Sequence, residues 1–129
     1  MQTRYTVTLA AIAGFGLGAV AIETIHAQAK PPVFYIAEIE LLNADAYTKE
    51  YAPKAQATIK KHGGRLLAAG SKTTSFEGAP PKQRVAVQQW ESIEQIQKWR
   101  SSPEYKEARQ IGDKYAKFRG FAIEGVPQQ

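Results

Sequence analysis

Alternation of apolar and polar side chains marks the first folded segment of the chain. The sequence VFYIAEIEL, residues 33–41, is rich in β-branched and aromatic residues and follows a Pro-Pro pair, which predicts a strand. One face of this strand is apolar throughout and carries Val33, Tyr35, Ala37, Ile39 and Leu41. The other face begins with Phe34 and Ile36 and ends with Glu38 and Glu40. The first face therefore belongs to a core, and the second is apolar at one end only.

A change to a four-residue period predicts a helix after this strand. Asn43 is suited to cap its first free N–H groups. The apolar positions then recur every four residues at Tyr47, Tyr51, Ala55 and Ile59. Pro53 is expected to kink or restart the helix because it has no backbone N–H to donate. The Gly-Gly pair at 63–64 then ends it.

The remaining segments repeat the order of strand and helix. Strands are predicted over 65–69 and 73–77, as one strand bent near Gly70, and over 84–90 and 118–126. Ser92 and Gln95 have the spacing of a capping box and begin a second helix, which Pro103 restarts. The fold class is therefore α+β, a ferredoxin-like βαββαβ antiparallel sheet with two helices on one face.

Two helices leave the opposite sheet face bare. That face holds Phe34 and Ile36, and an apolar sheet face of this kind is rarely left in water. A second copy of the chain would cover it. We therefore expect a homodimer that forms a dimeric α/β barrel and encloses a cleft.

Residues 1–29 have the layout of a secretory signal peptide. A positive start that includes Arg4 precedes an apolar run, and Ala27-Gln28-Ala29 is an A-x-A cleavage site. The alternative is an uncleaved membrane anchor, because the run is just long enough to span a bilayer. Glu23 after the run and Pro31 after the site favour cleavage. We therefore expect a folded domain over 30–129 that is periplasmic or secreted, with membrane attachment only if the leader is uncleaved.

Composition excludes several kinds of site and partner. The chain has no cysteine, so it has no disulfide, no thiolate metal site and no cysteine nucleophile. Its formal net charge is +5, but acidic residues interleave with the basic ones and no basic stripe suits nucleic acid. Outside the leader, one histidine and scattered carboxylates make no convincing metal-ligand set. We expect no nucleic-acid partner, no metal and no cofactor.

Four stretches together resemble a known family. They are YIAEIE, YTKEYAPKAQATIKKHGGRLLAAG, FEGAPPKQRVAVQQWES and WRSSPEYKEAR, which occur in order over nearly all of 32–125. They are similar to the domain of unknown function 1330 (DUF1330) family. The resemblance implies a dimeric α/β barrel of ferredoxin-like protomers. That superfamily includes cofactor-independent monooxygenases, muconolactone isomerase-like enzymes, haem-associated proteins and proteins that only bind ligands, so the resemblance implies a fold and leaves the activity open. The leader departs from the pattern of many relatives.

Two residues are the weak candidates for acid–base catalysis. His62 in KKHGG is the one histidine of the mature chain, and it suits either a general base or the end of a helix before Gly63. We favour the helix end. Glu38 and Glu40 share a strand face, where one neighbouring carboxylate can raise the pKa of another. The alternative is a solvated strand edge, or carboxylates neutralised by Arg84 or Arg119.

Aromatic side chains and one arginine are the candidates for ligand binding. The expected set is Tyr35, Glu38, Trp90, Tyr105 and Arg119, with Arg119 able to hold an anionic group or pair with Glu38. We expect a protein that binds a small organic ligand in the cleft between helices and sheet. Two alternatives stay open: a cofactor-independent enzyme, monooxygenase- or isomerase-like, that uses Glu38 or His62, and a structural dimer without a ligand.

Overall fold

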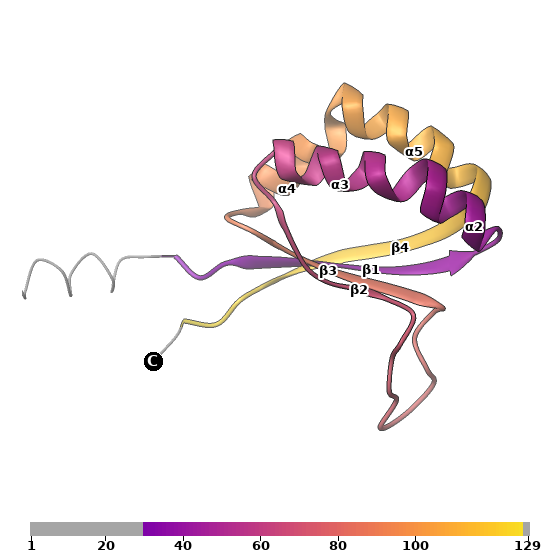
Figure 1. Ribbon diagram of the computed structural model, residues 1–129. Coiled ribbons are helices and arrows are strands. Elements are labelled where there is room, and N and C mark those ends of the chain that lie inside the picture. The colour runs from indigo at the N-terminus through magenta and orange to yellow at the C-terminus, as the bar shows by residue number, and fades with distance from the viewer. Residues whose placement is uncertain (1–29, 128–129) are drawn as a thin grey trace, which may run out of the picture. The chain divides into compact units, whose positions relative to one another are not determined.

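A layer of helices covers one face of a four-stranded antiparallel sheet in the computed structural model, which describes residues 30–127 (Figure 1). The strands are β1 (Val33–Leu41), β2 (Arg65–Gly70), β3 (Arg84–Trp90) and β4 (Ala116–Glu124), in the spatial order β2-β3-β1-β4. The helices are α2 (Ala44–Ala46), η1 (Tyr47–Tyr51), α3 (Ala52–Lys61), α4 (Ile93–Ser101) and α5 (Pro103–Tyr115). This confirms the predicted ferredoxin-like α+β fold. The predicted signal peptide lies outside the described residues.

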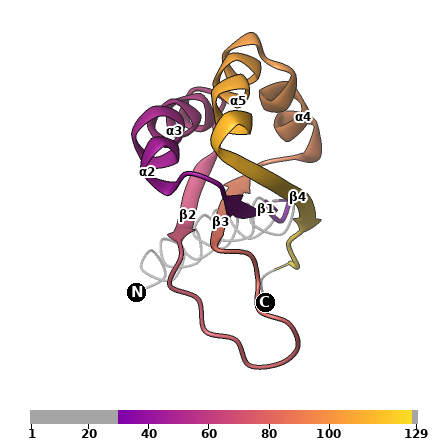
Figure 2. The ribbon, with the colours of Figure 1, turned by 90° about the vertical axis from the view of Figure 1, so that its right-hand side faces the viewer.

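The alternation along β1 places the core as predicted. Its helix-side residues Val33, Tyr35, Ala37 and Ile39 are buried. The opposite residues Phe34, Ile36, Glu38 and Glu40 are half-buried, and the helices within residues 30–127 all lie on the other face of the sheet (Figure 2). The register pairs Ala37 with Ala86 on β3 and with Gly120 on β4, so small residues meet at the middle of the sheet. The sheet therefore has one core face and one open face.

Side-chain caps and a proline set the helix boundaries. Asn43 Oδ1 accepts a hydrogen bond from the Ala46 N–H at 3.1 Å, and Ser92 Oγ accepts one from the Gln95 N–H at 3.1 Å. η1 is a π-helical turn that ends at Tyr51, and Pro53 lies in the first turn of α3, which follows it. The predicted caps and the predicted irregularity at Pro53 are therefore confirmed.

The strand predicted over 73–77 is wrong. Residues 71–83 form a loop that projects from the sheet on the face opposite the helices (Figures 1 and 2). An extended segment there has no neighbouring strand within residues 30–127 to complete a hydrogen-bonded ladder, and Gly78, with φ +74°, turns the chain back. The loop carries Phe76, which is 92% exposed. Within residues 30–127, no helix is both long and apolar enough to cross a membrane.

Candidate functional site

A cavity of about 60 Å³ lies between the helices and the core face of the sheet. Its wall contains residues of η1, α3, α4 and α5 above and of all four strands below. A buried water needs roughly 10–15 Å³ of such volume, so the cavity has room for a few non-hydrogen atoms. It is partly open, which allows a larger molecule to extend outward.

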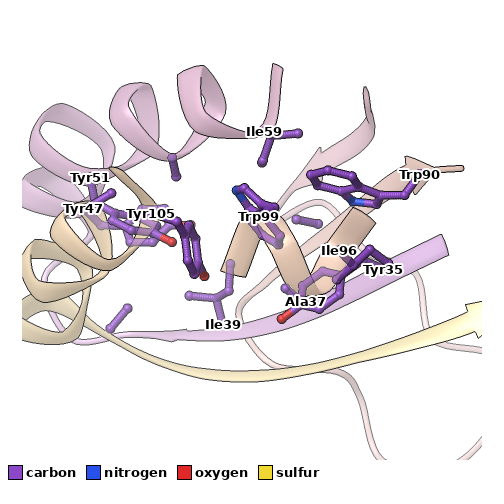
Figure 3. Close-up of a cluster of buried hydrophobic side chains, with 14 of the residues drawn as sticks. Tyr35, Ala37, Ile39, Tyr47, Tyr51, Ile59, Trp90, Ile96, Trp99 and Tyr105 are labelled. Carbon is purple, nitrogen blue, oxygen red and sulfur yellow. The ribbon is translucent and has the colours of Figure 1, made fainter. Parts of the chain in front are cut away.

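Trp99 on α4 forms the aromatic centre of this wall. It lies between Tyr105 and Trp90, with ring centroids 4.3 Å and 5.0 Å away, and meets Tyr35 edge-on at 5.5 Å (Figure 3). Its indole N–H donates to Thr58 Oγ1 at 3.0 Å. Trp99 is only 2% exposed, and its one polar atom is satisfied. Packing and a hydrogen bond therefore hold this part of the wall rigid.

Tyrosines supply most of the hydroxyl groups of the cavity. Tyr47 and Tyr51 come from η1, with ring centroids 5.1 Å apart, and Tyr105 comes from α5. Burial raises the pKa of Tyr47 and of Tyr51 above that of a free tyrosine. These hydroxyls therefore stay protonated at neutral pH and act as hydrogen-bond donors there. Gly112 leaves room for the Tyr51 ring, since a Cβ at position 112 would lie only 2.6 Å from it.

Two arginines reach this cavity from the helix side of the sheet and from α5. Arg84 begins β3 opposite Ile39, with its guanidinium 5.5 Å from the centroid of the Tyr47 ring. Arg109 on α5 stacks on the Phe118 ring at 3.9 Å. Its Nε donates to Asp113 Oδ1 at 2.8 Å, so its charge already has a carboxylate partner.

The structure places three of the five predicted ligand-binding residues in the cavity wall, namely Tyr35, Tyr105 and Arg119. Tyr35 and Tyr105 line the cavity, and the Tyr35 hydroxyl accepts a hydrogen bond from Arg100 Nη1 at 2.8 Å. Trp90 supports Trp99 from behind, is 2% exposed and lies outside the lining. Its indole N–H donates to Gln88 Oε1 at 2.9 Å, which leaves it no free donor.

Glu38 and Arg119 form an ion pair on the open face of the sheet. They lie directly opposite each other on β1 and β4, and Glu38 also accepts a hydrogen bond from the Lys82 N–H at 3.3 Å. Arg119 borders the cavity from its place on β4, but its guanidinium faces Glu38 and the Phe121 ring. Of the alternatives that the sequence left open, the pairing of Glu38 with Arg119 is the one that occurs, and Arg84 pairs with neither Glu38 nor Glu40.

His62 ends α3, as predicted. Gly63 has φ +88°, its N–H donates to the Lys60 carbonyl, and the Gly64 N–H donates to the Ile59 carbonyl at 2.9 Å. These bonds are those of a Schellman motif. His62 Nε2 lies 3.5 Å from Glu104 Oε2 at the start of α5, and His62 is outside the cavity lining.

Glu104 links the end of α3 to the start of α5. Lys61 Nζ donates to Glu104 Oε1 at 2.6 Å, and this bond is the main reason that the pKa of Glu104 falls to about 2.

We expect Glu104→Gln to lower the free energy of unfolding at neutral pH. Since the folded pKa is depressed, the stabilisation is complete above the ordinary pKa of 4.5 and disappears as the pH falls through about 2. Urea unfolding of the wild-type and Glu104→Gln proteins at neutral pH and at pH about 3 measures the difference between their free energies of unfolding. A difference that is larger at pH about 3 than at neutral pH contradicts the prediction.

The sequence prediction missed Arg84, Tyr47 and Tyr51 as site residues. In the sequence both tyrosines appear only as members of a four-residue apolar period, and buried aromatic residues recur at that spacing whether or not they line a cavity. Arg84 did carry a signal. It shares a strand face with Ala86, Gln88 and Trp90, so alternation places a charged side chain on the core side of the sheet.

Solved structures with the same fold differ widely from this sequence. A protein of unknown function from Rhodopseudomonas palustris has a TM-score of 0.63 at 15% identity, covering 82% of this chain and 92% of that one. SnoaB, a cofactor-independent oxygenase from Streptomyces nogalater, has a TM-score of 0.56 at 11% identity, covering 77% and 96%. A dimeric protein of unknown function with a ferredoxin-like fold from Bacteroides fragilis has a TM-score of 0.52 at 11% identity, covering 73% and 96%. These likenesses show the fold alone.

The family itself follows from the sequence. The model of the domain of unknown function (DUF1330) matches residues 32–126. No curated protein sequence matches the chain. The match spans most of its length, so the chain belongs to the DUF1330 family.

Proposed function

We propose that this domain binds a small organic molecule in the cavity between its helices and its sheet. The observation that carries the proposal is the wall itself, in which rigid aromatic rings surround a few polar groups. Ligand sites generally combine an apolar lining with a small number of placed polar groups. At about 60 Å³ the cavity is small, which favours a small ligand or the compact end of a larger one.

The two alternatives have less support. An enzyme that uses Glu38 or His62 as acid or base needs that residue beside the substrate, and neither lines the cavity. The likeness to an oxygenase concerns the fold only, and one fold hosts many activities. A structural dimer without a ligand would suit a core that is packed shut, whereas this core keeps an open space.

A fragment titration tests ligand binding. The probes are small organic acids, amides and alcohols, and the readout is the indole N–H signal of Trp99 in a ¹⁵N-edited NMR spectrum. We expect at least one class of probe to shift this signal with saturation.

Ala69→Phe should abolish the response, because Ala69 lies on the edge strand β2 and lines the cavity. Ala57→Phe is the matched control, since Ala57 is exposed on α3 and outside the lining. Probes that leave the Trp99 signal unchanged in the wild-type protein would overturn the proposal.

The open sheet face supports assembly as a homodimer. Phe121 and Ile123 on β4 are 43% and 56% exposed, and they continue the apolar surface of Phe34 and Ile36. The loop 71–83, which carries the exposed Phe76, projects on the same side of the sheet (Figure 2). A two-fold pairing of this face with itself would bury all of these side chains. The Bacteroides fragilis protein of similar fold is described as dimeric.

Export would place the domain outside the cytoplasmic membrane. The support is the A-x-A sequence at 27–29 after an apolar run. We expect the mature chain to begin at or near Lys30, because cleavage follows the second alanine of that site. N-terminal sequencing of the periplasmic fraction checks this, and a chain that keeps Met1 in the membrane fraction would contradict it.

A further inference from the structure

Arg84 gives the cavity a charge preference. We infer that the ligand is a small anion, of the carboxylate class, and that Arg84 binds its charged oxygen. This inference rests on the proposed function and specifies its ligand class. It follows from three features of the cavity wall: an unsatisfied donor, an unbalanced charge and a set of neighbouring hydroxyls.

The unsatisfied donor is Arg84 Nε. This atom is buried and has no hydrogen-bond partner among the described residues. Buried polar atoms of folded proteins are nearly always hydrogen-bonded, so a buried donor without a partner needs an explanation. A guanidinium pairs with a carboxylate through two parallel hydrogen bonds, and Nε is one of the donors available for that geometry. A bound carboxylate would satisfy the atom.

The charge around the cavity is unbalanced. Three arginines and no carboxylate belong to its lining within residues 30–127. Arg109 is neutralised by Asp113, and Arg119 by Glu38 on the other face of the sheet. Arg84 forms no ion pair with any described residue and lies against the Tyr47 ring instead. Its positive charge is therefore the one that a ligand would neutralise.

Neighbouring hydroxyls complete the site. Tyr47 lies beside the Arg84 guanidinium and interacts with it, and Tyr105 faces the same cavity. Each hydroxyl can donate a hydrogen bond to a carboxylate oxygen, which adds to the preference for an anion that the Arg84 charge sets. The volume allows a carboxylate with one to three carbons inside the wall, at roughly 10–15 Å³ for each water-sized group. A longer tail would leave through the open side.

Propionate and propionamide test the inference, because they share a shape and differ in charge. We expect propionate to shift the Trp99 indole signal with saturation, and propionamide to bind at least about tenfold more weakly. Arg84→Met should weaken propionate binding at least about tenfold, and Arg65→Met, which removes an exposed arginine of β2, should not. Tyr47→Phe is a second variant that removes one donor without removing a charge, and it should weaken binding more modestly.

The outcomes separate the inference from the proposed function. Equal binding of propionate and propionamide, or unchanged propionate binding by a folded Arg84→Met protein, overturns the anion inference and leaves ligand binding intact. If Arg84→Met fails to fold, unchanged binding by Tyr47→Phe overturns the inference in its place. If neither propionate nor propionamide shifts the Trp99 indole signal, the anion inference is overturned as well. The wider fragment titration then decides independently whether the cavity binds any ligand.

Discussion

Replacement of Trp99 by alanine will lower the free energy of unfolding by about 3–5 kcal/mol. Trp99 is 2% exposed and packs against Tyr35, Trp90 and Tyr105 at once. The truncation removes these contacts and leaves a void that the surrounding rings cannot refill. Since small domains are stable by only about 5–15 kcal/mol, the variant should unfold at much lower urea concentrations. Circular dichroism during urea titration measures the loss.

Trp99→Phe is the control for this prediction. Phenylalanine keeps an aromatic ring but cannot donate to Thr58, which still satisfies its own hydroxyl proton through the Ala55 carbonyl. Trp99→Phe should therefore lower the free energy of unfolding much less than Trp99→Ala does. If Trp99→Ala costs less than about 1 kcal/mol, Trp99 is not the centre of the core.

We expect replacement of Phe34 by glutamate to convert the proposed homodimer into monomers. Phe34 lies on the open face of β1, next to the exposed Phe121 and Ile123 of β4. Burying an aromatic side chain contributes about 1.5–3 kcal/mol, and a two-fold interface contains it twice. A carboxylate at that position would remove this favourable free energy of burial. It would also place one additional negative charge from each protomer in the interface. Light scattering coupled to gel filtration measures the mass.

Ala57→Glu is the matched control, because it introduces the same charge on the exposed surface of α3. It should leave the mass unchanged. Circular dichroism must show that Phe34→Glu keeps its helices and strands. An unchanged dimer in a folded Phe34→Glu protein, or a monomeric wild-type protein, would contradict packing through the open sheet face.

The order of elements could be predicted because each depends on local signals. The two-residue period of β1, the caps at Asn43 and Ser92, and the left-handed Gly63 all act within a few residues of their position. The segment 73–77 shows the limit of such signals. Its composition suits a strand, but a strand also needs a neighbour, and the loop turns away from the sheet before it can pair.

The cavity depends on contacts between distant segments, so the sequence indicated its general place but not its charge. Arg84, Tyr47 and Tyr105 come from three separate elements and meet only through packing. Trp90 shows the opposite difficulty, since a tryptophan at a strand end suits a cleft mouth as well as a core. In the structure it lies beneath Gly64, where a Cβ would come within 2.5 Å of the indole ring. Two glycines, Gly64 and Gly112, thus position aromatic rings that periodicity alone could not place.

A crystal structure of the protein soaked with the tightest-binding fragment tests ligand binding in this cavity most directly. We predict continuous density for that fragment among Trp99, Tyr105 and Arg84, with its oxygen atoms within hydrogen-bonding distance of Arg84 Nε. Density for the fragment on the open sheet face, or a cavity that holds only ordered water while the fragment is bound elsewhere, would contradict a ligand site between the helices and the sheet.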